Sequence, residues 1–209
     1  MSPLALQLLS IHRYPSFFTD LVAAKILFRY LSLFHGFLIG ESAIVRGLPI
    51  LSIARNSSIR IGDHAYLISR SRNTALGVNH PVILRTLKTN ARICIGSHFR
   101  ASGATLCAAS GLSIGNRVTM GANVTVMDTD FHASDTQVRS SMDDANQAKS
   151  AEVTIGDDVF VGMHALILKG VTIGRGATIG AGSVVTKDVL EGAIAAGNPA
   201  KVISPTTKG

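Results

Sequence analysis

Histidine is the side chain best suited to moving a proton near neutral pH, and the chain has seven histidines. His132 lies in a polar stretch, immediately after Asp128, Thr129 and Asp130. A positioned imidazole there could take a proton from an attacking group, because the unperturbed pKa of an imidazole, about 6.5, leaves it mostly neutral at pH 7. Asp130 or Asp128 could hold the ring in one tautomer, as the carboxylate of a catalytic triad does, or could bind the hydroxyls of an acceptor. The alternative is that His132 is an exposed loop histidine with no chemical role.

The other reactive residue types are less well placed for chemistry. Cys94 and Cys107 have neither metal-type nor redox spacing, and neither has a neighbouring base that would activate its thiol. We expect both thiols to be free and the compartment to be reducing. No second histidine lies within ten residues of His132, which disfavours a zinc site there. Three further histidines are interpreted as structural, although the first two could touch an acceptor: His80 in an NHP turn, His98 at a coil corner and His164 within a repeat.

The elements that would position these residues follow a repeat of six. Every sixth residue from Ile155 is aliphatic: Ile155, Val161, Ile167, Ile173, Ile179 and Val185. Small or β-branched residues follow four positions after each of these: Val159, Ala165, Val171, Ala177, Ser183 and Val189. Glycine directly follows the aliphatic residue at Gly156, Gly162, Gly174 and Gly180. A helix repeats every 3.6 residues and a strand every two, so a strict period of six fits neither alone.

A period of six predicts a coil with three flat sides. Each hexad forms a short strand and a corner, with the aliphatic side chain inside and glycine at the corner, where φ can be positive. The same pattern occurs upstream at Ile95, Ala101 and Cys107, and a weaker copy surrounds Ile61 and Leu67. We therefore expect an all-β solenoid domain over residues 56–203, after a capping segment (1–55) and before a short tail (204–209).

The period disappears between Val126 and Val153, where the chain is polar and unpatterned. Long excursions from a compact fold are usually functional or disordered, so the loop 127–152 is where we expect chemistry. Residues 16–35 have apolar residues at helical spacing and predict a helix. That helix would cap the open first coil, because solenoids need covered ends, or would make a peripheral membrane contact near a lipid-linked substrate.

Composition disfavours several kinds of binding partner and several cellular locations. The net charge is +7, but the basic residues are scattered and few aromatic residues lie among them, which disfavours nucleic acid. The N-terminus lacks a basic region and a clear cleavage site, so we expect no secretory signal. Residues 15–40 are interrupted by Asp20, Lys25 and Arg29, which disfavours a membrane span. We expect a cytoplasmic protein, with membrane association as an alternative.

Residues 155–189, IGDDVFVGMHALILKGVTIGRGATIGAGSVVTKDV, and residues 195–203, AAGNPAKVI, resemble the C-terminal half of hexapeptide-repeat O-acetyltransferases. With its DTDFH loop, the chain looks most similar to the sugar acetyltransferases of lipopolysaccharide, capsule and exopolysaccharide synthesis. The resemblance implies a left-handed parallel β-helix, a homotrimer with active sites between subunits, and acetyl-coenzyme A as donor with no metal. Left-handed winding comes from the resemblance alone, since parallel crossovers are otherwise right-handed.

The resemblance also implies roles for individual residues. His132 would be the general base and Asp130 its partner, with direct transfer rather than a covalent acyl-enzyme. The acetyl-coenzyme A residues carried over from the family are Gly162, Met163, Gly180 and Ala181 for the pantetheine arm, with Thr186, Lys187 and Lys201 near its phosphates. The acceptor would be a small-molecule or lipid-linked sugar, contacted by Asn79, Arg100 and Asp128.

One departure from the family bears on the acceptor. Where the maltose and galactoside enzymes have an acceptor-binding asparagine, this chain has RASGA (100–104), which puts those simple acceptors in doubt. Three alternatives to a sugar acetyltransferase stay open: the same fold acting on serine or an antibiotic, a metal-dependent hydratase of the gamma carbonic anhydrase type, and a non-catalytic scaffold.

Overall fold

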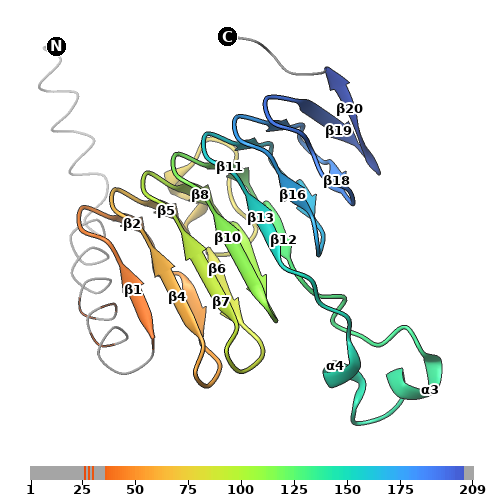
Figure 1. Ribbon diagram of the computed structural model, residues 1–209. Coiled ribbons are helices and arrows are strands. Elements are labelled where there is room, and N and C mark those ends of the chain that lie inside the picture. Colours follow the sequence, from red (N-terminus) through yellow and green to blue (C-terminus); the bar gives the residue numbers. More distant parts are fainter. Residues whose placement is uncertain (1–25, 27, 29, 31–35, 205–209) are drawn as a thin grey trace, which may run out of the picture.

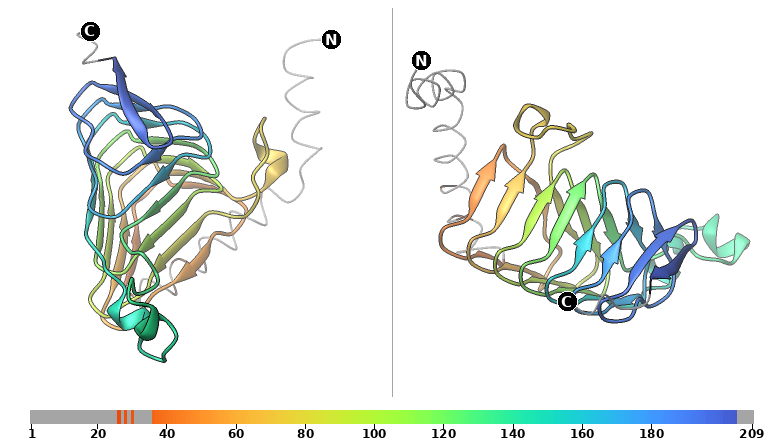
Figure 2. Two further views of the ribbon diagram at one scale, coloured as in Figure 1. Left: turned by 90° about the vertical axis from the view of Figure 1, so that its right-hand side faces the viewer. Right: turned by 90° about the horizontal axis from the view of Figure 1, so that it is seen from above.

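A computed structural model describes residues 26, 28, 30 and 36–204 of the chain. The chain winds into a three-sided solenoid of short strands (Figure 1), and its outline along the axis is triangular (Figure 2). The first sheet contains β1 (Phe37–Ile39), β4 (Ser58–Ile61), β7 (Arg92–Ile95), β10 (Gly111–Ile114), β13 (Val153–Ile155) and β16 (Thr172–Ile173). The second contains β2 (Ile44–Arg46), β5 (Tyr66–Ile68), β8 (Arg100–Ser102), β11 (Thr119–Ala122), β14 (Phe160–Val161), β17 (Thr178–Ile179), β19 (Ile194–Gly197) and β20 (Ala200–Ser204). The third contains β3 (Ile50–Ser52), β6 (Ile83–Thr86), β9 (Thr105–Ala108), β12 (Thr125–Met127), β15 (Leu166–Ile167) and β18 (Val184–Val185).

Strands pair in parallel with strands one coil away, except that β20 runs antiparallel to β19. The pairing keeps like residues above one another, so an isoleucine column runs through the first sheet: Ile39, Ile61, Ile95, Ile114, Ile155 and Ile173. The column stays in register although a long excursion separates Ile114 from Ile155. The protein is thus mostly β with parallel sheets, consistent with the left-handed β-helix that the resemblance implies.

The residues that repeat every six positions form the core. The six aliphatic residues from Ile155 to Val185 are each at most 1% exposed. The residues of the second track, from Val159 to Val189, are also buried. All of these residues except the polar Ser183 belong to one continuous cluster that fills the interior of the coil. The predicted inward positions of the C-terminal coils are therefore confirmed.

The corner glycines have a different cause from the one expected. Gly156 does not have a positive φ; the left-handed residue of its corner is Asp158, two positions later. A Cβ on Gly156 would lie 2.7 Å from the backbone nitrogen of Arg175 in the next coil, and one on Gly96 would lie 2.7 Å from that of Asn116. Glycine is needed after the aliphatic residue because successive coils approach closely there, and not because the backbone is left-handed.

The solenoid begins earlier than the sequence indicated. β1, β2 and β3 pair with β4, β5 and β6, so residues 37–52, which were assigned to the capping segment, form the first coil. The repeat is hard to see there because apolar residues occupy outward positions beside the inward ones. Residues 26, 28 and 30 are helical, and the ring of Phe28 packs 5.1 Å from that of Phe37 between centroids. The rest of the predicted helix 16–35, and residues 205–209 of the tail, lie outside the described residues.

Cys107 does not occupy the inward position that the repeat predicted. Leu106 and Ala108 point into the core, and Cys107, between them, faces outward beside Arg85 and Met127. The phase shifts because only five residues, rather than six, separate the inward Ala101 from Leu106 at a tight turn. Burial raises the pKa of the Cys107 thiol, which makes it a poorer nucleophile.

Three corners join the sheets. We call them the first corner (sheet one to two), the second corner (sheet two to three) and the third corner (sheet three to one). Two of them carry excursions, which project in different directions (Figure 2). Residues 70–81, with the short helix η1 (Ser71–Asn73), leave the second corner, and residues 128–152 leave the third corner. The 70–81 excursion was not predicted.

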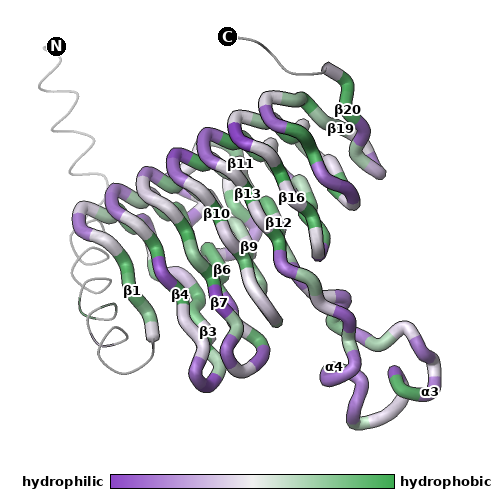
Figure 3. Tube along the Cα trace, viewed as in Figure 1, coloured by the Kyte–Doolittle hydropathy of each residue, from purple (hydrophilic) through white to green (hydrophobic). Residues whose placement is uncertain are grey.

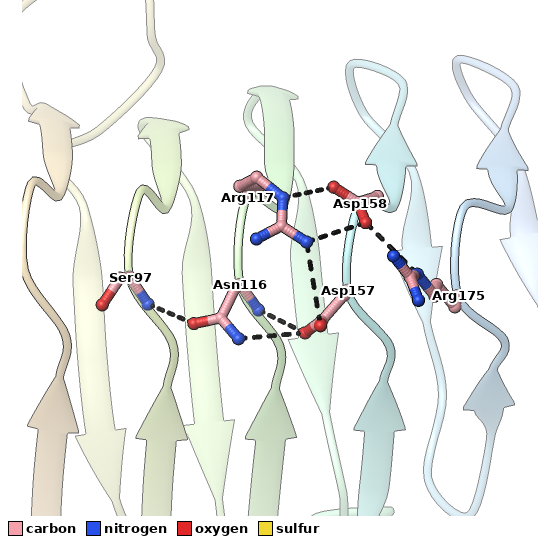
Figure 4. Close-up of polar contacts among 6 residues, drawn as sticks. All are labelled: Ser97, Asn116, Arg117, Asp157, Asp158 and Arg175. Carbon is pink, nitrogen blue, oxygen red and sulfur yellow. Dashed lines mark hydrogen bonds and ion pairs between the residues drawn. The ribbon is translucent and has the colours of Figure 1, made fainter.

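The first corner carries a ladder of polar contacts between successive coils (Figure 4). The Ser97 N–H donates to Asn116 Oδ1 at 2.9 Å, and the Asn116 N–H donates to Asp157 Oδ1 at 2.7 Å. Arg117 holds Asp158 through two hydrogen bonds of 2.5 and 2.9 Å. These bonds lower the pKa of the Asp158 carboxyl and raise the pKa of the Arg117 guanidinium. The hydrogen bonds of this ladder hold successive coils together.

Candidate active site

The 128–152 excursion leaves the third corner on a short two-stranded stem. Thr129 and Ser150 form an antiparallel bridge, and the Asp130 N–H donates to the Lys149 carbonyl at 3.0 Å. The Ala151 N–H donates to the Asp128 carbonyl at 2.9 Å. The stem closes the loop at its base, so the chain returns to the solenoid in the correct register for β13.

Asp128 anchors this stem and does not reach an acceptor. Its side chain is fully buried, and its two oxygens accept the backbone N–H groups of Ala109, Ser110 and Gly111 at 2.6–2.7 Å. These bonds tie the third corner of one coil to the corner below it. The prediction that Asp128 binds substrate is therefore wrong, because no carboxylate oxygen faces solvent.

Two short helices form the tip of the excursion, α3 (Thr136–Arg139) and α4 (Asp144–Gln147) (Figure 1). The Asp135 carboxylate caps α3 by accepting the N–H groups of Gln137 and Val138. Asp144, the first residue of α4, points back toward the stem, where the Ala133 N–H donates to its Oδ1 at 2.7 Å. α4 thus brings a carboxylate beside His132.

His132 and Asp144 form a hydrogen-bonded pair, with 2.6 Å between Nδ1 and Oδ2. A carboxylate only accepts hydrogen bonds, so Nδ1 carries the proton and Nε2 of the neutral ring is a free base. The hydrogen bond from His132, followed by that from the Ala133 N–H, lowers the pKa of the Asp144 carboxyl. The His132 side chain is 67% exposed and that of Asp144 18%. The pair can orient an imidazole that removes a proton from an incoming hydroxyl.

Asp130 pairs with Lys169 and not with His132, the partner that was predicted. The Lys169 ammonium donates to Asp130 Oδ1 at 2.6 Å, and this ion pair ties the stem to the next coil. The carboxylate that holds His132 is Asp144, twelve residues further along the chain. Sequence reasoning chose the nearer acid because folding of the loop tip is not visible in a polar, unpatterned stretch.

The backbone beside His132 is left-handed. Phe131 has φ of 63°, a conformation that costs a non-glycine residue about 1–2 kcal/mol. The Phe131 N–H makes only a long contact of 3.3 Å to Thr129 Oγ1. Nine other non-glycine residues of the described chain also have a positive φ, most of them at coil corners. At Phe131 this conformation turns the chain so that His132 faces Asp144.

The residues predicted for the acyl donor lie mainly along the second corner. Met163 and Ala181 occupy this corner in successive coils, and the Met163 carbonyl accepts the Gly182 N–H at 2.8 Å. A Cβ on Gly180 would lie 2.7 Å from Ala196, whose register partner is Lys201. Gly162, Met163, Gly180, Ala181 and Lys201 are thus brought together. Thr186 and Lys187 are not, because they follow β18 at the third corner.

The residues predicted for the acceptor are also separated from His132. Arg100 lies on the outer face of the second sheet, between Tyr66 and Thr119. Asn79 lies in the 70–81 excursion, where its N–H donates to Asn123 Oδ1 at 2.8 Å. His80 beside it has Nδ1 2.8 Å from the Pro81 carbonyl, which can only accept a hydrogen bond. The other two histidines considered, His98 and His164, have left-handed backbones at corners.

Within one chain the third sheet separates the two groups. His132 lies at one edge of that sheet and Met163 and Ala181 at the other. A side of the coil is about six residues long, or up to roughly 20 Å of extended chain. Direct transfer needs reacting atoms about 3 Å apart. Within one chain, His132 and the residues predicted for the acyl donor therefore lie at separate corners.

Residues 36–204 contain no group of three or more His, Cys, Asp or Glu side chains placed to hold a metal ion. Cys94 and Cys107 are both free. Among the residues that the structure describes, no helix has the length and apolar character to cross a bilayer.

Comparison with known proteins bears on the coils after the excursion. Residues 152–187 match the family model described as bacterial transferase hexapeptide (six repeats). The chain carries the hexapeptide repeat of bacterial transferases. The resemblance to this repeat family is thus confirmed, and the hexapeptide match covers β13–β18 but not the loop that carries His132.

Two kinds of relatives share the hexapeptide fold. A putative acetyltransferase of Schizosaccharomyces pombe is 42% identical over 92 residues, 44% of this chain and 42% of that protein, so the match spans less than half of either. The crystal structure of AntD, an N-acyltransferase from Bacillus cereus with bound dTDP and 3-hydroxybutyryl-CoA, aligns with a TM-score of 0.62 at 18% identity, over 86% of this chain and 88% of that one. A maltose O-acetyltransferase from Clostridium difficile 630 aligns with a TM-score of 0.53 at 22% identity, over 93% and 90%. At these identities the structural matches establish the fold.

Proposed function

We propose that the protein is an acetyl-coenzyme A-dependent O-acetyltransferase that acetylates a hydroxyl of a sugar or glycan precursor. The observation that carries the proposal is the His132–Asp144 pair, which presents an unprotonated Nε2 at the edge of the solenoid. The repeat family and the coenzyme A thioester bound to AntD support a thioester donor. The maltose enzyme, which shares the fold, supports a sugar acceptor.

The chain's own residues account for the proton. Nε2 of His132 takes the proton of the acceptor hydroxyl as the oxygen attacks the thioester carbonyl carbon. The new C–O bond gives a tetrahedral intermediate, and the C–S bond breaks to release the coenzyme A thiolate. The imidazolium returns its proton to that sulfur, so the products are an acetyl ester and coenzyme A. The Asp144 carboxylate stabilises the imidazolium between these steps and fixes the ring.

The division of the site between two corners supports an oligomer. We propose a homotrimer in which each chain is a left-handed β-helix. The second corner of one chain, with Met163 and Ala181, would hold the pantetheine arm and face the His132 loop of its neighbour. Lys201 beside that corner is placed for the phosphates of coenzyme A. Lys187 and Thr186 would reach the same donor only from the neighbouring chain. Since acetyl-coenzyme A is a cytoplasmic metabolite, we place the reaction in the cytoplasm.

The test is a thiol-release assay with acetyl-coenzyme A and a panel of hydroxyl and amine acceptors. We expect coenzyme A release with a sugar hydroxyl, a product that alkali hydrolyses as an ester, and loss of turnover in His132→Ala. His98→Ala is the matched control, because His98 stacks on His64 at the first corner, 4.8 Å between ring centroids. An alkali-stable amide product, or turnover that persists in His132→Ala, would contradict the proposal.

A further inference from the structure

The first coil exposes apolar residues on all three of its sheets, whereas Val202 and Ile203 at the other end of the solenoid, which are also exposed, lie on the second sheet alone. Leu38, Ile44 and Ile50 are 49%, 43% and 42% exposed, and they lie on the first, second and third sheets. Leu48, at the second corner of the same coil, is 42% exposed. We call these four residues the apolar ring. Because the ring passes around every side of the coil, a partner packed against one sheet would leave most of it exposed.

On the first two sheets, arginines lie at the register of the ring residues in the next coils, whereas on the third sheet Ile83 follows Ile50. Arg60 follows Leu38 on the first sheet, and Arg100 follows Ile44 and Tyr66 on the second. Arg85 follows Ser52 on the third sheet. Arg92 lies beside Arg60 on the first sheet, one coil further along. We call Arg60, Arg85, Arg92 and Arg100 the basic belt, and no acidic side chain among the described residues forms an ion pair with them.

The charge of the solenoid is divided along its axis. Residues 36–110 contain nine Lys and Arg and two Asp and Glu, a net charge of +7. Residues 111–204 contain seven basic and ten acidic residues, a net charge of −3. The cationic half is the half that bears the apolar ring. Figure 3 shows hydrophobic β1 at that end of the tube.

The spacing of ring and belt fits the surface of a bilayer. Coils are stacked about 4.8 Å apart, so the basic belt lies about 5–10 Å from the apolar ring. The polar headgroup layer of one leaflet is about 5–8 Å thick, which is the depth that separates acyl chains from lipid phosphates. Leu and Ile at the acyl boundary with Arg at the phosphates is the arrangement that interfacial anchors use.

We infer that the first coil docks end-on to an anionic membrane, with the apolar ring at the acyl boundary and the basic belt among lipid phosphates. The interior of this coil is already covered, because Phe28 packs on Phe37. Ile26 and Tyr30, which are helical and 66% and 54% exposed, lie at the same end and would meet the membrane together with the ring. The inference does not require the proposed function. It would place the base of the third-corner excursion, three coils or about 15 Å from the apolar ring, about 5–10 Å above the headgroups, within reach of a glycan carried on a lipid.

The test is flotation of the full chain with vesicles of phosphatidylcholine alone or with one quarter phosphatidylglycerol. We expect binding to the anionic vesicles that weakens as salt is raised. The triple variant Arg60→Glu, Arg92→Glu, Arg100→Glu should weaken that binding by at least about 100-fold, since each cation near the surface contributes about 1 kcal/mol. Leu38→Ser with Ile44→Ser and Ile50→Ser should also release the protein.

Matched controls lie at the other end of the chain. Arg175→Glu, on a later coil, and Leu190→Ser, at a residue 74% exposed, should bind vesicles as the wild type does. All variants should keep the wild-type circular dichroism and the same coenzyme A release with a soluble acceptor, so that docking and catalysis can fail independently. The inference is overturned if the wild type stays unbound on anionic vesicles, if the controls lose binding equally, or if the ring and belt variants bind undiminished.

Discussion

The first and third corners of the solenoid use the same residue types for different purposes. At the first corner, Asn116, Arg117, Asp157 and Asp158 sit in register, and each bonds to a residue one coil away (Figure 4). At the third corner Asp128 and Asp188 behave in this way, because each accepts backbone N–H groups from the preceding coil. Asp144 lies on the excursion, outside the register, and its partner is an imidazole whose second nitrogen faces solvent. A carboxylate inside the stacking pattern stabilises the fold, whereas one outside it can serve chemistry.

The largest effect should come from removing the imidazole of the third corner. His132→Ala is expected to lower kcat by about 10²–10⁴-fold, the usual contribution of a general base. Affinity for coenzyme A, measured by calorimetry, should not change, because His132 is assigned to the proton and not to the donor. If His98→Ala, on the first corner, lowered kcat as much, the contrast between a structural first corner and a catalytic third corner would be wrong.

Asp128 tests whether a third-corner carboxylate can be structural. Asp128→Ala leaves three backbone N–H groups without their acceptor, and we expect the free energy of unfolding to fall by about 3–5 kcal/mol. Asp128→Asn keeps one acceptor oxygen and should lose less. Urea denaturation measures both. If Asp128→Ala unfolded at the wild-type midpoint and lost only activity, Asp128 would belong with the catalytic residues after all.

Asp144 is a positioning residue, and its substitution should affect rate more than binding. Asp144→Asn offers an amide donor to Nδ1, which favours the tautomer with a proton on Nε2, the wrong one for a base. We expect kcat to fall about 10–100-fold, less than in a buried triad because the ring is exposed. The KM for acetyl-coenzyme A should stay at the wild-type value. Asp144→Glu should recover part of the rate, which a purely structural role would not explain.

The smallest effect is expected at the first corner. Arg117→Ala removes a surface ion pair, and such pairs contribute little to stability. Because the bonds from Arg117 lower the pKa of the Asp158 carboxyl, their stabilisation is present above the ordinary pKa of an aspartate and is lost as pH falls through the lowered value. The small decrease in Tm relative to wild type should therefore vanish in acid, while activity at neutral pH is unchanged. A large loss of activity would show that this corner is not only structural.

Sequence periodicity predicted the parts of the fold that repeat. The inward positions from Ile155 to Val185 and the excursion that carries His132 follow from spacing, since a coil forces equivalent residues into one column. Irregularities were missed. A one-residue deletion before Leu106 turned Cys107 outward, and outward apolar residues hid the first coil.

Contacts made across the loop were also beyond the sequence. The pairing of His132 with Asp144, rather than Asp130, depends on how a short helix folds back. Lys169 and Asn123, which hold Asp130 and the Asn79 backbone, give no signal before their coils are stacked. Acidic residues near a histidine in the sequence suggest a histidine–carboxylate pair, but only the folded loop shows which carboxylate is the partner.

The central claim is that catalysis joins the third corner of one chain to the second corner of another. His132→Ala and Ala181→Trp, which fills the proposed donor groove, should each be inactive alone. Mixed oligomers made by co-expression should regain about one quarter of wild-type activity, because that share of sites in a random mixture pairs an intact His132 with an intact Ala181. Mixed oligomers that stay as inactive as the two parents would contradict the claim.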